Sequence, residues 1–270
     1  MKVVLFCGGL GMRLREHTGA VPKPMVTIGD RPILWHIMKY YAHYGHKDFV
    51  LCLGYKASVI KEFFLNYNEA VTNDFVLRRG GRNMELLSSD IHDWRITFLD
   101  TGLRANIGER LKAVQHYLAG EEVFLASYGD CLTDAPLSDF VDDFRARDKI
   151  ASFVSVPPPY PLHFIEQRED GVVTSVESVR ESPLWINGGY FILRQKVFDY
   201  IAAGEELVEE PFQRLIDKQL LITYPYRGFW APMDTLRERQ ELEALAATGR
   251  PPWAIWRTAR PPMSLAGRFG

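Results

Sequence analysis

Apolar residues along the chain alternate between short continuous runs and longer amphipathic segments. Residues 2–7 read KVVLFC, an apolar run of the length of a buried strand. Residues 33–44 repeat apolar side chains at helical spacing and end before Gly45, which predicts an amphipathic helix. Residues 48–53 form another buried, strand-like run. Strand, loop, helix and strand in this order predict a βαβ unit with parallel strands and a right-handed crossover.

The same alternation continues downstream and predicts an α/β fold. After a run of three prolines, Pro157 to Pro159, the pattern shortens into two brief strands, which predicts a β-rich insert covering the sheet. The expected strands are residues 75–78, 95–99, 121–127, 150–156, 163–167, 172–176, 185–193 and 220–226, and the expected helices are residues 57–67, 107–118, 137–147, 195–203, 210–218 and 236–248.

Composition narrows the class of protein. A chain of 270 residues with 47% hydrophobic content can bury one large core. Lys and Arg number 32 against 34 Asp and Glu, and this net charge of −2 argues against a nucleic-acid partner or an anionic membrane surface. Cys7, Cys52 and Cys131 lie far apart in apolar runs, which predicts reduced thiols. No run of about 18 apolar residues occurs, so we expect a cytoplasmic protein.

A glycine-rich loop follows the first strand directly. Gly8, Gly9 and Gly11 lie within four positions, and Met12 and Arg13 come next. Because glycine has no Cβ, backbone N–H groups of such a loop can approach an anion closely. The loop therefore predicts contact with phosphate, although a plain tight turn is the alternative for a glycine run alone.

A lysine follows this loop at short range. Lys23 lies ten residues past Arg13, and Pro22 and Pro24 restrict the backbone on both sides of it. A lysine held beside a phosphate-binding loop predicts chemistry at phosphorus.

The combination of these two segments resembles a known family. GGLGMR at residues 8–13 followed by PKPM at residues 22–25 resembles the N-terminal signature of the sugar-1-phosphate nucleotidyltransferases. GDRPILWHIMK at residues 29–39 is most similar to the glucose-1-phosphate cytidylyltransferase branch. The resemblance extends over residues 2–256. It implies a Rossmann-like three-layer fold with a mixed, mostly parallel sheet, one catalytic domain at residues 1–257, a sugar-binding insert near 150–190 and a tail at 258–270.

Two aspartates are candidate metal ligands. Asp130 follows the buried run at 121–127, and a carboxylate at the carboxyl end of a central strand lies where open α/β sheets bind ligands. Asp234 precedes the last predicted helix. Mg²⁺ prefers hard oxygen ligands and takes one or two carboxylates together with phosphate oxygens. The resemblance supports the pair, since residues 129–130 and 233–235 match the family's metal-aspartate motifs. The alternative is that each aspartate only caps a helix or closes a turn.

The resemblance also assigns roles to individual residues. A segment at residues 82–85, together with Gly108, is expected to frame the base. The catalytic residues it implies are Lys23, Arg13 and Asp130; the nucleotide-binding residues are Gly8, Gly9, Gly11, Met12, Arg13, Lys23, Gly108 and Arg110; the sugar-binding residues are Tyr128, Glu177, Asn187 and Gly188; and the Mg²⁺ ligands are Asp130 and Asp234.

This chain departs from the family pattern at two points. The family carries a lysine upstream of its Asn-Gly-Gly, whereas this chain has Ser178 or Ser182 there, depending on the alignment. A serine can donate to phosphate but cannot neutralise it, and Arg180 is a possible substitute. Cys131 also stands where the family usually has glycine after the aspartate. Both changes bear on the identity of the sugar.

The leading hypothesis is therefore an Mg²⁺-dependent enzyme that joins CTP and a sugar 1-phosphate, expected to be glucose 1-phosphate, into a CDP-sugar and pyrophosphate. One alternative is a nucleotidyltransferase for a different base or a non-glucose phosphate. Another is a non-catalytic regulatory protein that binds nucleotide sugars. The resemblance further implies a homo-oligomer, while a zinc site around His36, His43 and His46 lacks a supporting frame of cysteines or carboxylates.

Overall fold

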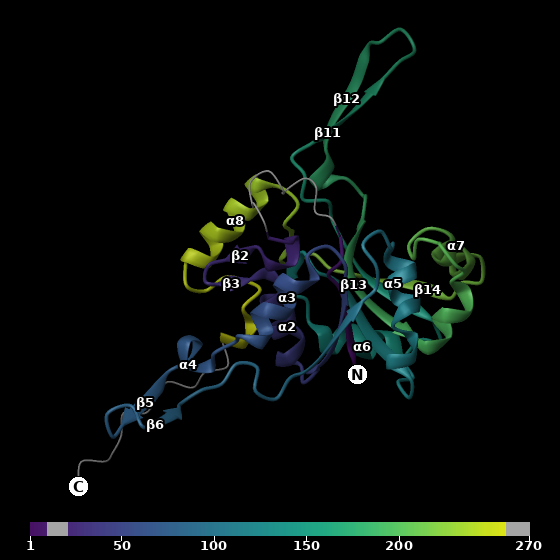
Figure 1. Cartoon of the computed structure of the whole chain (residues 1–270). Coiled ribbons are helices and arrows are strands. Elements are labelled where there is room, and N and C mark those ends of the chain that lie inside the picture. Colours follow the sequence, from purple (N-terminus) through teal and green to yellow (C-terminus); the bar gives the residue numbers. More distant parts are fainter. Residues whose placement is uncertain (10–20, 258–270) are drawn as a thin grey trace.

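The centre of the molecule is a mixed sheet of seven strands. The computed structural model describes residues 1–9 and 21–257. The strand order is β14-β10-β13-β8-β1-β4-β7, and β13 alone runs antiparallel to its neighbours in this sheet (Figure 1). The strands are β1 (Val3–Phe6), β4 (Asp48–Leu53), β7 (Arg95–Asp100), β8 (Val123–Tyr128), β10 (Ala151–Val156), β13 (Ile186–Arg194) and β14 (Leu221–Pro225).

Both faces of this sheet are covered, which gives three layers. Successive side chains of β1 point to opposite faces: Val3 and Leu5 enter one hydrophobic cluster, and Val4 and Phe6 enter the other. The first cluster includes buried residues of α2 (Ile33–His43), α3 (Ala57–Leu65), α6 (Leu137–Arg145) and α8 (Leu236–Ala247), and the second those of α5 (Ile107–Ala113) and α7 (Glu210–Asp217). The predicted three-layer α/β fold with a mostly parallel sheet is confirmed.

Some predicted helices are shorter or tighter than expected. The helix expected at 107–118 is divided into α5 and a 3-10 turn, η3 (Gln115–Leu118). The division lies at Val114, which leaves helical geometry at φ −98°, ψ 1°. The helix expected at 195–203 is the 3-10 segment η5 (Gln195–Tyr200). The other short helices are α4 (Glu69–Thr72), η2 (Lys23–Met25), η4 (Val179–Glu181) and η6 (Ile255–Arg257).

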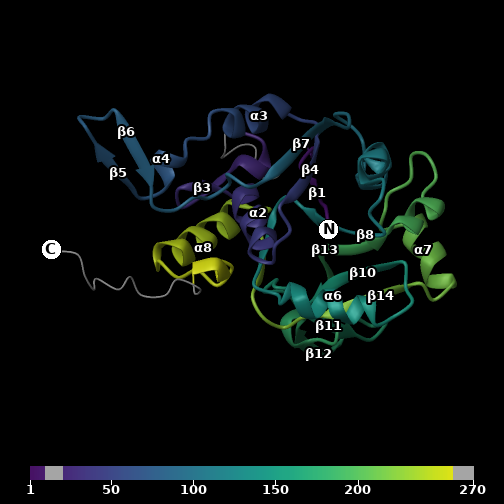
Figure 2. The ribbon, with the colours of Figure 1, turned by 90° about the horizontal axis from the view of Figure 1, so that it is seen from below.

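In the part of the chain that the structure describes, four two-stranded ladders lie outside the central sheet. Two of them, β5–β6 and β11–β12, are hairpins that extend away from the body of the molecule in Figure 1, and Figure 2 shows the same for β5–β6. No strand was expected between residues 78 and 95, but residues 83–86 form β6 and pair with β5. The ladder strands are β2 (Thr27–Ile28) with β3 (Arg31–Pro32), β5 (Phe75–Arg78) with β6 (Asn83–Leu86), β9 (Cys131–Thr133) with β15 (Trp230–Pro232), and β11 (His163–Gln167) with β12 (Val173–Ser178).

The region expected as an insert has two parts. β10 and β13, at its two ends, are strands of the central sheet, so only the chain between them, which carries β11 and β12, leaves the sheet. All three cysteines are buried and free, as predicted. Within residues 1–9 and 21–257 no helix has the length and apolar character needed to cross a membrane. The predicted tail at 258–270 lies outside the described residues.

Candidate active site

The candidate site lies where the parallel strands of the sheet end. β1, β4, β7 and β8 run in one direction, so their carboxyl ends meet at the same edge. Thr101 follows β7 directly, and Gly8 and Asp130 are the second residues after β1 and β8. Open α/β sheets bind ligands in the crevice outside this edge. The edge is therefore the position where a phosphate-bearing substrate is expected.

Lys23 lies between two carboxylates at this edge. Its Nζ donates a hydrogen bond of 2.6 Å to Oδ2 of Asp130 and a second, shorter one to Oδ1 of Asp234. These aspartates are 107 and 211 residues from Lys23 in sequence. The side chain of Lys23 is 12% exposed, and those of Asp130 and Asp234 are 30% and 23% exposed. One cation is thus held by two carboxylates that solvent can still reach.

The electrostatics of this group favour a charged lysine. Burial alone would lower the pKa of Lys23, since the ammonium loses hydration. The negative charge of Asp130 and the hydrogen bonds to both aspartates outweigh this, and the pKa of Lys23 is raised. The lysine therefore stays protonated and supplies a fixed positive charge.

Close backbone packing positions Asp130. A Cβ on Gly129 would lie 2.9 Å from the carbonyl oxygen of Phe6 and 3.4 Å from Cγ of Pro24, so only glycine permits this approach of β8 to β1 and to the lysine segment. The Cys131 side chain is buried, and its Sγ lies 3.2 Å from Oδ1 of Asp130. Burial raises the pKa of the Cys131 thiol, and the adjacent Asp130 charge adds to this. The protonated thiol can therefore donate to one oxygen of Asp130 while Lys23 binds the other.

A short ladder brings Asp234 to the same place. β15 pairs antiparallel with β9, and the N–H of Met233 donates to the carbonyl of Asp130 over 2.9 Å. The helix α8 is capped by Thr235, whose side chain accepts from the N–H of Glu238, while Glu238 accepts from Thr235 N and Asp234 N. The alternative that Asp234 serves as the cap is therefore wrong: its carboxylate faces Lys23 instead.

Arg110 supports the glycine loop from the core side. Its guanidinium is buried at 2% exposure and donates to the carbonyls of Gly8 and Leu53 over 3.1 Å each and to Oγ1 of Thr101 over 2.7 Å. Burial lowers the pKa of Arg110. A Cβ on Gly8 would lie 2.0 Å from Nη1 of Arg110, so Gly8 is needed for this contact. Arg110 thus joins the ends of three strands, and a direct contact with nucleotide stays a prediction.

Three predicted sugar-binding residues come together on the neighbouring strands. The Nδ2 of Asn187 donates to the hydroxyl of Tyr128 over 3.4 Å, and Oδ1 of Asn187 accepts from the N–H of Gly189 over 2.9 Å. The indole N–H of Trp230 donates to the carbonyl of Gly188 over 2.7 Å. Because β13 is antiparallel to β8, its first residues lie at the carboxyl end of β8, close to where Asp130 follows.

Other predicted residues are not brought to Lys23. Gly108 is buried in α5, where a Cβ would lie 2.2 Å from the carbonyl of Glu205, which gives it a packing role. Glu177 is exposed on β12, paired with Phe164 in a hairpin that leaves the body of the molecule. Residues 82–85, expected to frame the base, lie on the exposed hairpin β5–β6.

The possible substitutes for the family lysine have local partners. The hydroxyl of Ser182 donates to the carbonyl of Val179 over 2.7 Å within a 3-10 turn, and Nε of Arg180 donates to the carbonyl of Pro159 over 2.9 Å. Ser178 ends β12 at the base of the second hairpin. Of the predicted nucleotide loop, Gly8 is buried and Gly9 exposed, whereas Gly11, Met12 and Arg13 lie outside the described residues.

Sequence reasoning missed two residues that shape the site. Glu238 holds the backbone of Asp234, and the spacing of Thr235 and Glu238 is a capping-box signal that could have revealed it. Trp230 links the Gly188 strand to the Asp234 strand, and no local signal indicates a contact across 42 residues.

The donor set suits a hard divalent cation shared with phosphate. Among residues 1–9 and 21–257 no group of three or more His, Cys, Asp and Glu side chains is placed to hold a metal by itself. Asp130 and Asp234 already bind one cation between them, the Lys23 ammonium, and Mg²⁺ needs only one or two carboxylates when phosphate oxygens complete its shell. The arrangement could therefore position and neutralise a polyphosphate.

Comparison with known proteins identifies the family of this chain. The nucleotidyl transferase family model matches residues 2–233. The glucose-1-phosphate cytidylyltransferases of Salmonella typhimurium and Salmonella typhi are 40% and 39% identical over 257 residues, which is 95% of this chain and 100% of each relative. The crystal structure of HddC from Yersinia pseudotuberculosis matches the fold with a TM-score of 0.62 at 20% identity, over 90% of this chain and 98% of that one. The resemblance seen in the sequence is confirmed, and the chain belongs to the nucleotidyl transferase family.

Proposed function

We propose that this protein transfers the cytidylyl group of CTP to glucose 1-phosphate and releases pyrophosphate and CDP-glucose. The observation that carries the proposal is the placement of Lys23 between Asp130 and Asp234 at the carboxyl edge of the sheet. The choice of CTP and glucose 1-phosphate is supported by the relatives, which are named glucose-1-phosphate cytidylyltransferases and are aligned over their whole length.

The reaction is a displacement at phosphorus. A phosphate oxygen of glucose 1-phosphate forms a bond to the α-phosphorus of CTP, the bond from that phosphorus to the β-phosphate oxygen breaks, and the electron pair leaves with pyrophosphate. Positioning and charge neutralisation dominate such transfers. Lys23, whose pKa is raised by the two aspartates, would stabilise the charge on the phosphates that meet at this edge.

Mg²⁺ fits the pair of aspartates, and Asp130 and Asp234 would hold it. When bound, the ion would neutralise charge on the triphosphate. In the structure the Lys23 ammonium occupies the position between the two carboxylates. If these aspartates held a metal, Lys23 would give up a carboxylate, and its N–H groups would be available to phosphate. Tyr128 and Asn187, joined by their hydrogen bond, would orient the sugar.

A substrate panel tests the proposal. The purified chain is incubated with Mg²⁺, each of CTP, UTP, dTTP and GTP, and each of glucose, mannose and galactose 1-phosphate, and both pyrophosphate and nucleotide sugar are measured. The highest kcat/KM with CTP and glucose 1-phosphate supports the proposal. Bound nucleotide without pyrophosphate release for any pair would instead indicate a regulatory protein.

A second candidate is the same chemistry on a different sugar phosphate. It is favoured by one observation: Ser182 and Ser178 stand where the family resemblance expects a lysine, and the hydroxyl of Ser182 donates to Val179. A serine leaves a phosphate charge uncompensated at this position. A higher kcat/KM for another sugar 1-phosphate in the same panel would select this candidate.

A further inference from the structure

The hairpin β5–β6 has one continuous apolar face that is open to solvent. Side chains on a strand alternate between faces, and the register pairs Phe75 with Leu86 and Leu77 with Met84 on the same face. These four side chains are 42%, 38%, 57% and 54% exposed, in that order. The opposite face pairs Val76 with Glu85 and Arg78 with Asn83. The hairpin is thus amphipathic, and its apolar face has no cover within the described chain.

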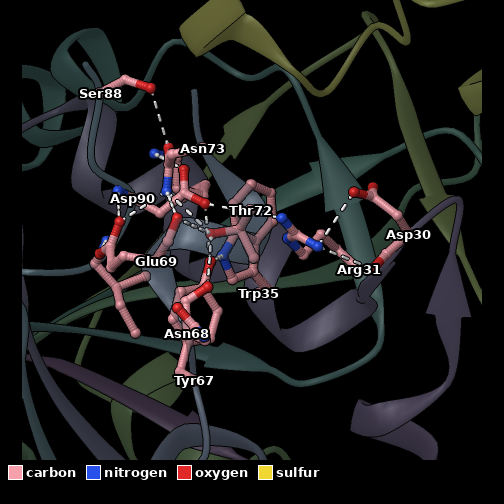
Figure 3. Close-up of polar contacts among 12 residues, drawn as sticks. Asp30, Arg31, Trp35, Tyr67, Asn68, Glu69, Thr72, Asn73, Ser88 and Asp90 are labelled. Carbon is pink, nitrogen blue, oxygen red and sulfur yellow. Dashed lines mark hydrogen bonds and ion pairs between the residues drawn. The ribbon is translucent and has the colours of Figure 1, made fainter. Parts of the chain in front are cut away.

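The base of this hairpin is firmly attached to the body (Figure 3). The carboxylate of Glu69 accepts hydrogen bonds from the N–H groups of Asp90 and Ile91, each 2.8 Å, and from the side-chain amide of Asn73 over 2.7 Å. Asp90 in turn accepts from the hydroxyl of Tyr67 over 2.8 Å and lies 3.6 Å from Nζ of Lys39 on α2. The arm therefore presents its apolar face in a defined place.

A fixed apolar face of this kind points to a partner surface. A two-stranded hairpin is at best marginally stable alone in water, and contiguous exposed apolar patches on soluble proteins mark interaction sites. An uncovered hairpin also invites unwanted strand pairing. The partner must cover the apolar face and complement the charges around it.

The second hairpin, β11–β12, offers matching features. Ile165 and Val176 are cross-strand partners on one face, 60% and 61% exposed, and Val173, nearer the tip, is 52% exposed. Two hairpins of this width can pack face to face, as two sheets do. Its apolar face is therefore suited to an apolar face on another hairpin.

The charges of the two hairpins are opposite. Residues 75–87 carry Arg78, Arg79 and Arg82 against Glu85, three positive charges less one negative, which gives +2. Residues 163–178 carry four acidic residues against one arginine, which gives −3. Arg79 and Arg82 are exposed at one turn, and Glu169 is exposed at the other. Complementary charges of this kind steer association and fix its register. The acidic residues of 163–178 are Glu166, Glu169, Asp170 and Glu177.

We propose that β5–β6 of one copy of this chain packs against β11–β12 of a second copy. The two hairpins of a single chain extend in different directions in Figure 1 and lie apart in Figure 2, so they do not pack against each other. The contact joins two different surfaces of the chain and is therefore heterologous. Copies joined in this way can form a closed ring, or two copies can make the contact twice, each hairpin binding the other copy. The proposal does not depend on the catalytic assignment.

The first test removes the apolar contact. Sedimentation velocity of the full chain over a range of concentrations should show a defined multimer for the wild type. The double variant Leu77→Glu/Met84→Glu should sediment as a monomer, because it places two charges in the apolar contact. Ile216→Glu is the matched control: Ile216 is 52% exposed on α7, away from both hairpins, and this variant should keep the wild-type mass.

The second test identifies the partner surface by charge exchange. Arg79→Glu/Arg82→Glu and Glu169→Arg/Asp170→Arg, which change charges at the two hairpin turns, should each raise the concentration at half-association by about tenfold or more, since like charges then face each other. The chain that carries all four changes should regain wild-type association. Far-ultraviolet circular dichroism should be the same for all variants.

Three results would overturn the proposal. One is a wild-type chain that stays monomeric at all concentrations. Another is a multimer whose mass the Leu77→Glu/Met84→Glu variant leaves unchanged. The third is dissociation by both charge variants with no recovery in the fourfold variant, which would show that the two hairpins do not contact each other.

Discussion

Trp230 and Gly188 are joined by a hydrogen bond of 2.7 Å, in which the indole N–H donates to the backbone carbonyl. Gly188 follows Asn187 on β13, and Trp230 begins the strand that leads to Asp234. A Cβ on Gly188 would lie 3.3 Å from the indole nitrogen, so glycine allows this close approach. The bond connects the strand proposed to bind sugar with the strand proposed to hold the metal.

Loss of this hydrogen bond should therefore mainly weaken the binding of the sugar phosphate. In Trp230→Phe the carbonyl of Gly188 loses its donor, which costs about 1–3 kcal/mol when such a group stays buried. We expect the KM for sugar phosphate to rise about fivefold or more, with the KM for nucleotide near wild type. Steady-state kinetics with each substrate varied in turn measures this split.

Trp94→Phe is the matched control, because Trp94 packs against Phe49 outside the site. It should leave both KM values unchanged. Equal changes in the two KM values of Trp230→Phe would mean that Trp230 supports the whole fold rather than the sugar side.

Removing either acidic charge should suppress catalysis. Asp130→Asn and Asp234→Asn keep the shape of the side chain but weaken its interaction with a cation. We expect kcat to fall by about 100-fold or more in each, the scale of losing one preorganised electrostatic contact. Asp139→Asn, an exposed residue in the first turn of α6, serves as control and should retain kcat. Near-wild-type turnover of either site variant would remove that aspartate from the mechanism.

Lys23→Met should show whether the Lys23 ammonium and Mg²⁺ take the same position between the two aspartates. Without the ammonium, Asp130 and Asp234 repel each other, and we expect a loss of about 1–2 kcal/mol, or ~2–8 °C in Tm. Mg²⁺ should then raise the Tm of this variant more than that of the wild type, since it replaces the missing positive charge. Thermal unfolding with and without Mg²⁺ measures both effects. An Mg²⁺ response equal to that of the wild type would show that lysine and metal do not share a position.

His36 should make stability depend on pH. Burial lowers the pKa of His36 to about 4, and its ring nitrogens contact Trp253 Nε1–H at 3.3 Å and the Ile28 carbonyl at 3.1 Å. Indole only donates, so Nδ1 accepts, and protonation would remove this acceptor. The unfolded histidine titrates near 6.5, so the unfolded state binds more protons between about pH 4 and 6.5 and stability falls as pH falls through that window.

Urea unfolding at pH 7.5 and 5.5 measures this dependence. His36 alone should account for a loss of about 1.4 kcal/mol between these values. His36→Gln should show a correspondingly smaller loss, while His46, whose pKa burial also lowers to about 4, contributes equally to both proteins. The same loss in variant and wild type would exclude His36 as the cause.

The parts of the site that were predictable are those with local signals. Asp130 follows a buried apolar run, so it could be placed at the sheet edge, and Lys23, between two prolines, was expected beside the glycine loop that follows the first strand. The fold followed from apolar runs of strand and helix length. Cys131, a departure from the family pattern, turns into the core and contacts Asp130.

The parts that were not predictable depend on distant packing. The contacts that bury Arg110 could not be predicted, because its acceptors, Gly8, Leu53 and Thr101, come from three separate parts of the sequence, and its contact with nucleotide stays a prediction. Glu177 was assigned to the sugar, but its strand pairs with β11 in a hairpin rather than lining the sheet edge. The spacing of residues along the chain does not indicate the acceptors of Arg110 or the strand that pairs with the strand of Glu177.

The central claim is that Asp130 and Asp234 together bind the cation that accompanies the triphosphate. Crystals grown with CTP and Mn²⁺, which has a measurable anomalous signal, test it directly. The account predicts an anomalous peak at coordination distance, about 2.0–2.2 Å, from a carboxylate oxygen of each aspartate and from a phosphate oxygen, with the Lys23 ammonium moved toward phosphate. Bound nucleotide with Lys23 still between the two carboxylates, or with the peak elsewhere, would contradict it.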